Sequence, residues 1–245
     1  MRRFIVPSAQ LDSEIVNITG ELFRHMITVL RLSITDELIL ADERGREASA
    51  VILDIKDKEI ICRLMALPEG VKGISKLQIT LYQALPKGEK LDFILQKATE
   101  LGVTHIVLFD SERSVVKIAD DKLEKKLTRW RRIVQEAARQ SGSVIPFVDF
   151  CENIADLSEF QKADLKLVLW EEEHNRHLKT VFKDLKIPDS IAVMVGPEGG
   201  FTEEEVAVAK SLGFISVTLG KRVLRTETAG ITMLSILQYL WGDLG

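Results

Sequence analysis

The chain has 245 residues, of which 46% are hydrophobic and 29% are charged, and its formal net charge is −4. These values are ordinary for folded globular proteins and exclude a fibrous, low-complexity or histone-like chain. No stretch of 18 apolar residues occurs, and no signal-peptide-like stretch follows the two arginines at the start, so we expect a cytoplasmic protein without a membrane span. Between residues 73 and 150, 13 Lys and Arg outnumber 10 Asp and Glu, an asymmetry typical of a local nucleic-acid contact.

Residues 1–72 have the pattern of a small mixed-strand β-barrel. We predict strands over residues 3–6, 37–42, 48–54 and 59–67, because these runs are β-branched or alternating and are separated by turn residues. One helix is predicted after Thr19-Gly20-Glu21, with the apolar face Leu22, Phe23, Met26, Ile27 and Leu30. Cys62 lies in the last apolar run and is expected to be a core residue. Gly and Pro residues between positions 68 and 73 interrupt the pattern, so we divide the chain into domains 1–72 and 73–245.

The pattern changes to alternating strands and helices in residues 73–245. Strands are predicted over 77–85, 103–109, 165–170, 191–195 and 214–219, and helices over 89–101, 122–141, 202–212 and 226–241. Such alternation predicts a parallel sheet covered by helices on both faces. The last helix is apolar nearly all round, so we expect it to pack both on its own sheet and on a second subunit.

Two loops stand out at the carboxyl ends of the predicted strands, where parallel sheets bind ligands. The first is Gly196–Gly200 (GPEGG), and the second is Leu219–Ala229 (LGKRVLRTETA). The glycines let the backbone approach a ligand closely, although a tight strand-to-helix turn would also use them. Thr202 and Glu205 have the spacing of a capping box, and the acidic first turn of their helix would repel a phosphate. The chain also lacks the glycine-rich signatures of phosphate and dinucleotide sites, whereas a neutral adenosine with a cationic sulfonium is compatible with these loops.

Several segments resemble, in order and spacing, the motifs of one bacterial enzyme family. They are His25–Arg31 (HMITVLR), Lys97–Val103 (KATELGV), Arg129-Trp130, Ala137–Gly142 (AARQSG) with Pro146, Gly196–Phe201 (GPEGGF) and Leu219–Ala229. Together they span nearly the whole chain, which resembles the RsmE family of 16S ribosomal RNA uridine-N3 methyltransferases in the SPOUT superfamily. Three positions depart from the family pattern: Ser143 stands where Arg is usual, and Lys221 and Val223 replace Pro and Ile.

The resemblance implies an α/β protein with an N-terminal PUA-like β-barrel, which binds RNA, and a C-terminal SPOUT α/β domain. This second domain would contain a parallel sheet, a C-terminal trefoil knot, the site for S-adenosyl-L-methionine and the interface of a homodimer. The activity implied is methylation of N3 of a specific uridine in the decoding region of 16S ribosomal RNA, in the small ribosomal subunit. A rival interpretation is a non-catalytic RNA-binding assembly factor with the same fold, which Ser143 favours and the near-intact ligand loops oppose.

The two loops supply the predicted cofactor site. Its residues are Val195, Gly196, Pro197, Glu198, Gly199, Gly200, Leu219, Gly220, Val223, Leu224, Arg225 and Thr228. Arg225 is the predicted catalytic cation, because it could stabilise the charge that spreads onto the uracil oxygens as N3 loses its proton. Its alternative role is a structural salt bridge to Glu198 or Glu227. These two carboxylates are the candidate catalytic proton acceptors.

Basic residues from both domains make up the predicted RNA-binding set. They are Arg2, Arg3, Arg24, His25, Arg31, Lys87, Lys125, Arg129, Arg132 and Arg139. Those on the helix over 122–141 form either a phosphate-binding surface or a solvated helix face. Trp130, among them, is expected either to stack on a base or to anchor the core. No metal site is expected, because His174 and His177 lack a third placed ligand.

Overall fold

The computed structural model describes residues 2–42, 46–65, 77–159, 163–183 and 185–244, without the side chains of residues 2, 3, 120, 158 and 159. The chain forms two compact units, Met1–Ile74 and Ser75–Gly245. The boundary predicted between residues 72 and 73 falls outside the described residues. None of the described helices has both the length and the apolar character that crossing a membrane requires.

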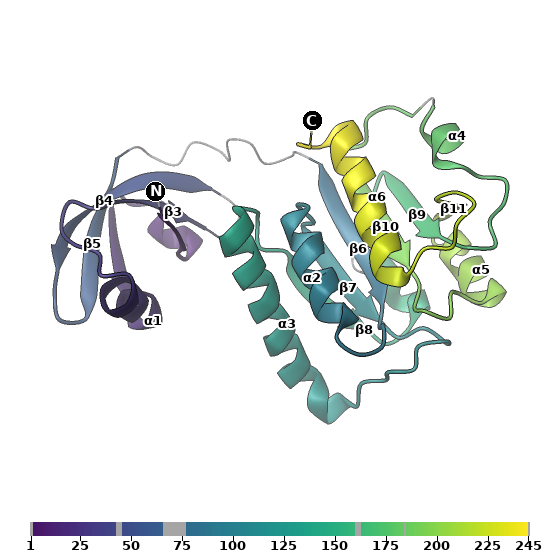
Figure 1. Cartoon of the computed structure of the whole chain (residues 1–245), viewed down its shortest axis with the longest axis horizontal. Helices are drawn as coiled ribbons and strands as arrows, with labels where there is room; N and C mark the ends of the chain where they lie inside the picture. Colours follow the sequence, from purple (N-terminus) through teal and green to yellow (C-terminus); the bar gives the residue numbers. More distant parts are fainter. Residues whose placement is uncertain (1, 43–45, 66–76, 160–162, 184, 245) are drawn as a thin grey trace. The chain divides into compact units, whose positions relative to one another are not determined.

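The N-terminal unit is a mixed five-stranded sheet with a helical segment packed against it (Figure 1). Its strands are β1 (Arg2–Ile5), β2 (Ile15–Thr19), β3 (Glu37–Ala41), β4 (Glu47–Ile55) and β5 (Glu59–Leu64), in the spatial order β1-β3-β4-β5-β2. β1 and β3 run parallel, and the other neighbours run antiparallel. The short 3-10 turn η1 (Ser8–Gln10) precedes β2. The predicted helix consists of α1 (Gly20–Arg24) and the π-helical turn η2 (His25–Val29).

The core of this unit confirms the prediction for Cys62. Met26 and Cys62 are fully buried in the apolar cluster that joins the helix to the sheet, and burial raises the pKa of the Cys62 thiol to about 11. The sequence pattern does not predict β2, because its alternation of exposed and buried residues extends over only five positions. Ile15 is apolar but 42% exposed beside the buried Val16, so the residue types of this segment do not alternate as a half-buried strand requires.

The C-terminal unit contains a parallel sheet, as predicted, with six strands where the sequence pattern predicts five. Its strands are β6 (Gln78–Ala84), β7 (His105–Phe109), β8 (Phe147–Cys151), β9 (Leu165–Leu169), β10 (Ser190–Val195) and β11 (Ile215–Val217), in the order β11-β9-β10-β6-β7-β8. Its helices are α2 (Lys90–Glu100), α3 (Asp120–Ser141), α4 (Leu178–Phe182), α5 (Glu203–Ser211) and α6 (Thr226–Trp241), with a 3-10 turn η3 (Ile154–Glu159). The sequence pattern misses β8, a short edge strand.

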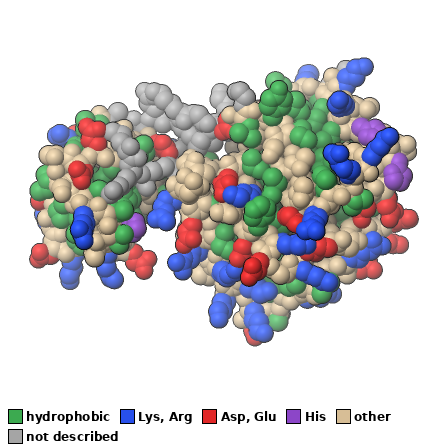
Figure 2. Space-filling model, in the orientation of Figure 1, with side chains coloured by type: hydrophobic (Ala, Val, Ile, Leu, Met, Phe, Trp, Pro, Cys, Tyr) green, Lys and Arg blue, Asp and Glu red, His purple; other side chains and the backbone are tan. Residues whose placement is uncertain are grey.

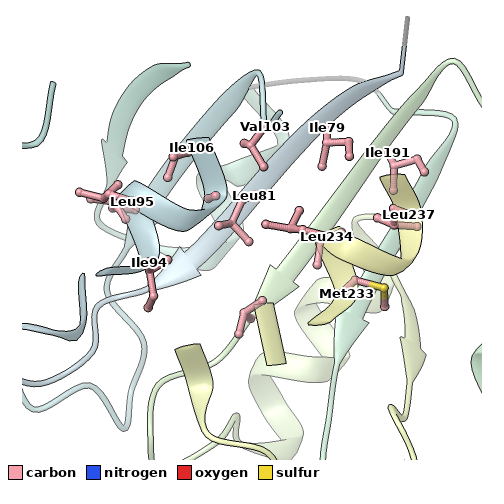
Figure 3. Packing of buried hydrophobic residues seen from close by; sticks show 14 of the residues in the cluster. Ile79, Leu81, Ile94, Leu95, Val103, Ile106, Ile191, Met233, Leu234 and Leu237 are labelled. Carbon is pink, nitrogen blue, oxygen red and sulfur yellow. The ribbon is translucent and has the colours of Figure 1, made fainter. Parts of the chain in front are cut away.

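Helices cover both faces of the sheet. On one face, Leu81 of β6 lies between Leu95 of α2 and Leu234 of α6 (Figure 3). Trp130 of α3 is 3% exposed in the same cluster, so it anchors the core and does not stack on a base. On the other face, Val206 of α5 packs against the buried residues of η3 and the strands. Because all six strands run parallel, their carboxyl ends lie at one edge of the sheet.

Candidate functional site

A pocket of about 720 Å³ opens at the carboxyl ends of β9, β10 and β11. This volume is in the range of about 300–1,000 Å³ that is usual for small-molecule sites. The structure brings the two predicted loops together in its wall. The lining residues are Lys90, Leu169, Trp170, Glu171, His174, Val195, Gly196, Pro197, Glu198, Gly200, Val217, Thr218, Leu219, Gly220, Lys221, Arg222, Val223, Leu224, Arg225, Thr226 and Ala229.

A buried series of hydrogen bonds holds two lining residues of this pocket, Gly196 and Thr226. Gln83, near the end of β6, donates from Nε2 to Thr226 Oγ1 at 3.0 Å, and Thr226 Oγ1 donates to the Gly196 carbonyl oxygen at 2.6 Å. Gln83 also donates to the Ala84 carbonyl at 2.9 Å. Because Gln83 and Thr226 are buried, water cannot replace these bonds. These hydrogen bonds thus connect β6 to the loop Gly196–Gly200 and to the start of α6.

Lys90 of α2 organises the two candidate carboxylates. Its Nζ lies 2.7 Å from Glu198 Oε1 and 3.9 Å from Glu227 Oε2. The backbone N–H of Lys87 also donates to Glu198, at 3.1 Å. Partial burial alone would raise the pKa of Glu198, but the hydrogen bonds from Lys90 and from backbone N–H groups lower it. Glu198 is therefore ionised at neutral pH and is a weak base.

Arg225 does not make the structural salt bridge considered above. Both of its possible partners, Glu198 and Glu227, face Lys90, and no ion pair of Arg225 is found among the described residues. Arg225 is exposed and lines the pocket. Its guanidinium is consequently available to a ligand or substrate at the pocket mouth.

Three predicted site residues do not line the pocket: Gly199, Glu227 and Thr228. Arg113, in the loop after β7, lies against Gly199 and donates from Nη1 to its carbonyl oxygen at 3.0 Å. Thr228 lies on the exposed side of α6. Glu227 Oε2 is buried behind the wall, with no hydrogen-bond partner among the described residues. A place in the sequence motif therefore does not by itself bring a side chain to the pocket.

Sequence reasoning missed Lys90 and the segment after β9, which contributes Glu171 and His174 to the pocket. The predicted strand over 165–170 contained a usable signal, because its carboxyl end had to reach the same edge of the sheet as the two loops. Glu171 approaches the first loop closely: a Cβ added to Gly200 would meet its Oε1 at 1.6 Å. Among the described residues, no three His, Cys, Asp or Glu side chains come together as a metal would require.

The predicted RNA-binding residues occupy separate places in the two units. In the N-terminal unit Arg24 and Arg31 are exposed and His25 is half-buried, whereas the side chains of Arg2 and Arg3 are outside the described part. In the C-terminal unit all five are exposed: Lys87, Lys125, Arg129, Arg132 and Arg139. Arg129 pairs with Asp92, and Arg132 pairs with Glu136 at 3.1 Å. Such exposed pairs are weak, so they leave both arginines available to a phosphate.

Comparison with known proteins shows to which class of protein this fold and site belong. Residues 74–238 match the model of an RNA methyltransferase domain, and residues 18–65 match that of an RNA methyltransferase PUA domain. A Bacillus subtilis relative, named ribosomal RNA small subunit methyltransferase E, is 35% identical over 91% of this chain and 89% of its own. The chain belongs to the family of ribosomal RNA small subunit methyltransferase E.

Two solved structures resemble the whole chain. The ribosomal RNA small subunit methyltransferase E of Neisseria gonorrhoeae, bound to S-adenosyl methionine, is 33% identical and has a TM-score of 0.84 over 100% of both chains. A Legionella pneumophila protein in complex with the cofactor SAM is 35% identical, with a TM-score of 0.82 over 99% of this chain and 98% of its own. The similarity therefore extends over both units.

The residues of the pocket fit S-adenosylmethionine. Leu169, Val195 and Val217 form apolar walls, which suit a purine ring, and the loop backbones offer N–H and C=O groups to its polar edge. Gly200 has a φ of +68°, a conformation that glycine adopts without strain. The Glu198 and Glu171 carboxylates suit the cationic groups of this cofactor.

Proposed function

We propose that this protein transfers the methyl group of S-adenosylmethionine to N3 of a uridine in the decoding region of 16S ribosomal RNA, in the small ribosomal subunit. The observation that carries the proposal is the pocket, in which the two family motifs meet at Arg225, a cation that forms no ion pair with any other described residue. Relatives named ribosomal RNA small subunit methyltransferase E, and the similar structure bound to S-adenosyl methionine, support it. Such an enzyme would act in the cytoplasm, where ribosomal subunits are assembled.

The bound cofactor would supply an electrophilic methyl group on a sulfonium. Arg225, at the pocket mouth, would face the uracil carbonyl oxygens, whose negative charge grows as N3 loses its proton, and would stabilise that charge most in the transition state. Glu198 lines the pocket and would take the proton directly or through water, and its lowered pKa makes it a weak base in either case. Glu227 lies behind the wall and would act only through Lys90.

A homodimer and a C-terminal trefoil knot are part of the proposal. Figure 2 shows hydrophobic side chains gathered over α6, where Tyr239 is 71% and Leu240 45% exposed. A second subunit would cover this face, and sedimentation should show a dimer at micromolar concentration; a monomer would refute it. The knot rests on the family alone, because general folding rules disfavour knots, and a crystal structure of the full chain would test it.

The activity is tested with labelled S-adenosylmethionine and ribosomal RNA from cells that lack the enzyme. Label should enter the RNA of the small subunit, and mass spectrometry should locate it at N3 of one uridine. RNA binding without incorporation would instead support the rival assembly factor, which Ser143 favours.

RNA affinity is proposed to depend on both units. Reversing Lys125, Arg129 and Arg132 to Glu should weaken RNA binding and flatten its salt dependence, while cofactor affinity stays unchanged. If RNA binding is unaltered, the basic side of α3 is only solvent-exposed. The contact with RNA would then come mainly from Arg2, Arg3, Arg24 and Arg31.

A further inference from the structure

The loop between β11 and α6 exposes an apolar tip among cations. Val223 is 81% exposed, more than any other large hydrophobic residue in the described part of the chain. Lys221, Arg222 and Arg225 surround it in sequence and are exposed as well. No ion pair of these three cations is found among the described residues, and no acidic residue occurs between positions 218 and 226.

Hydrogen bonds hold both ends of this loop. Thr218 Oγ1 donates to the Gly220 carbonyl at 3.1 Å and accepts from the Gly220 N–H at 3.3 Å. Gly220 has a φ of +125°, which favours glycine. At the other end, Thr226 is held by the buried hydrogen bonds to Gln83 and Gly196. The residues between them line the mouth of the cofactor pocket.

These features together fit a nucleic-acid strand. Exposed cations that form no ion pair with another described residue attract phosphates, whereas a loop that carries three cations and no acidic residue disfavours contact with the same loop of a second copy. An exposed aliphatic side chain gains free energy only where a partner covers it, and proteins insert such side chains between bases. An enzyme that acts on the Watson–Crick edge of a base must also take that base out of its stack.

We propose that the loop Gly220–Arg225 binds the RNA backbone beside the target nucleotide and that Val223 fills the space that the displaced uracil leaves in the base stack. Lys221 and Arg222 would bind the flanking phosphates. This inference rests on the proposed function and assigns to Val223 a positioning role, which is separate from the main-chain contacts of the same loop with the cofactor.

The test compares Val223→Ser with Ile187→Ser. Ile187 is also β-branched and is 73% exposed, but it precedes β10, at the opposite edge of the sheet. The probe is a synthetic hairpin of small-subunit ribosomal RNA that contains the mapped uridine, with the fluorescent base 2-aminopurine next to it. Unstacking on binding raises the fluorescence of 2-aminopurine.

Wild-type protein should raise the fluorescence, and Val223→Ser should abolish most of the rise and lower kcat/KM by roughly tenfold or more, as losing help with unstacking predicts. Val223→Leu, which keeps an aliphatic side chain, should retain both signals, and Ile187→Ser should match wild type. Lys221→Ala and Arg222→Ala should each reduce the salt slope of RNA binding by about one phosphate contact. Calorimetry should show unchanged cofactor affinity for Val223→Ser.

Two results would overturn the inference while the proposed function stands. In the first, Val223→Ser methylates RNA and unstacks the neighbouring base as well as wild type does. In the second, Val223→Ser weakens the dimer in sedimentation and leaves the fluorescence rise intact, which would make the loop a subunit contact. A wild-type protein that transfers no methyl group would instead refute the proposed function, and this inference with it.

Discussion

Thr226→Val should destabilise the protein more than the loss of one surface hydroxyl can explain. Valine has nearly the volume of threonine, so no cavity arises, but the buried Gln83 Nε2–H and the Gly196 carbonyl each lose a partner. An unsatisfied buried group costs about 1–3 kcal/mol, so we expect a loss of about 2–5 kcal/mol in the free energy of unfolding. For a unit of this size the corresponding fall in Tm is roughly 4–20 °C.

The assay is scanning calorimetry, with Thr128→Val as the matched control. Thr128 on α3 also donates its hydroxyl to a carbonyl, that of Glu124 at 2.9 Å, but the bond is exposed, so water replaces it and the expected loss is below about 0.5 kcal/mol. Cofactor affinity should weaken in Thr226→Val alone, because Gly196 belongs to the pocket wall. Equal Tm values for the two variants would refute the idea that the buried hydrogen bonds of Thr226 stabilise the pocket wall.

Three further outcomes follow from the structure. Arg225→Ala should lower methyl transfer by roughly a hundredfold or more, as the loss of one charge-stabilising donor does, with Tm and cofactor affinity nearly unchanged; a joint fall of all three would indicate a structural role. Burial alone would raise the pKa of Asp42, but hydrogen bonds from the Arg46 side chain and backbone lower it below 3.8. The stabilisation of the folded N-terminal unit by ionised Asp42 is therefore complete above the ordinary pKa of aspartate and is lost as the pH falls through the lowered pKa of the folded state. Asp42→Asn should consequently flatten the dependence of Tm on pH below about pH 5. An unchanged curve of Tm against pH would contradict this. Thr35 has a φ of 75°, so Thr35→Gly should stabilise the N-terminal unit by about 1 kcal/mol, whereas Thr19→Gly in the extended strand β2 should lower the Tm.

Local features were predictable wherever neighbours in the sequence decide the structure. The spacing of apolar residues predicted α2 and α3, and the capping box of α5 is present in both directions, because Thr202 and Glu205 are three residues apart. The glycine-rich loops could be placed at the carboxyl edge of the sheet, because every parallel strand ends there.

The tertiary structure decided which residues far apart in the sequence interact with one another. Glu198 pairs with Lys90, 108 positions away, and this pair turns a candidate base into a weak one. Gln83 meets Thr226 across 143 positions, and Glu171 reaches the pocket only because β9 lies beside β10 in the sheet. Periodicity and motifs describe residues that are close together in the sequence. The order of the strands in the sheet determines which distant side chains share a pocket, and hence which of them pair and how their pKa values shift. For that physical reason the sequence by itself determined most of the helices and strands and the two ligand loops, but not β2 or β8. Only the packed sheet decided the chemistry of the carboxylates between the loops.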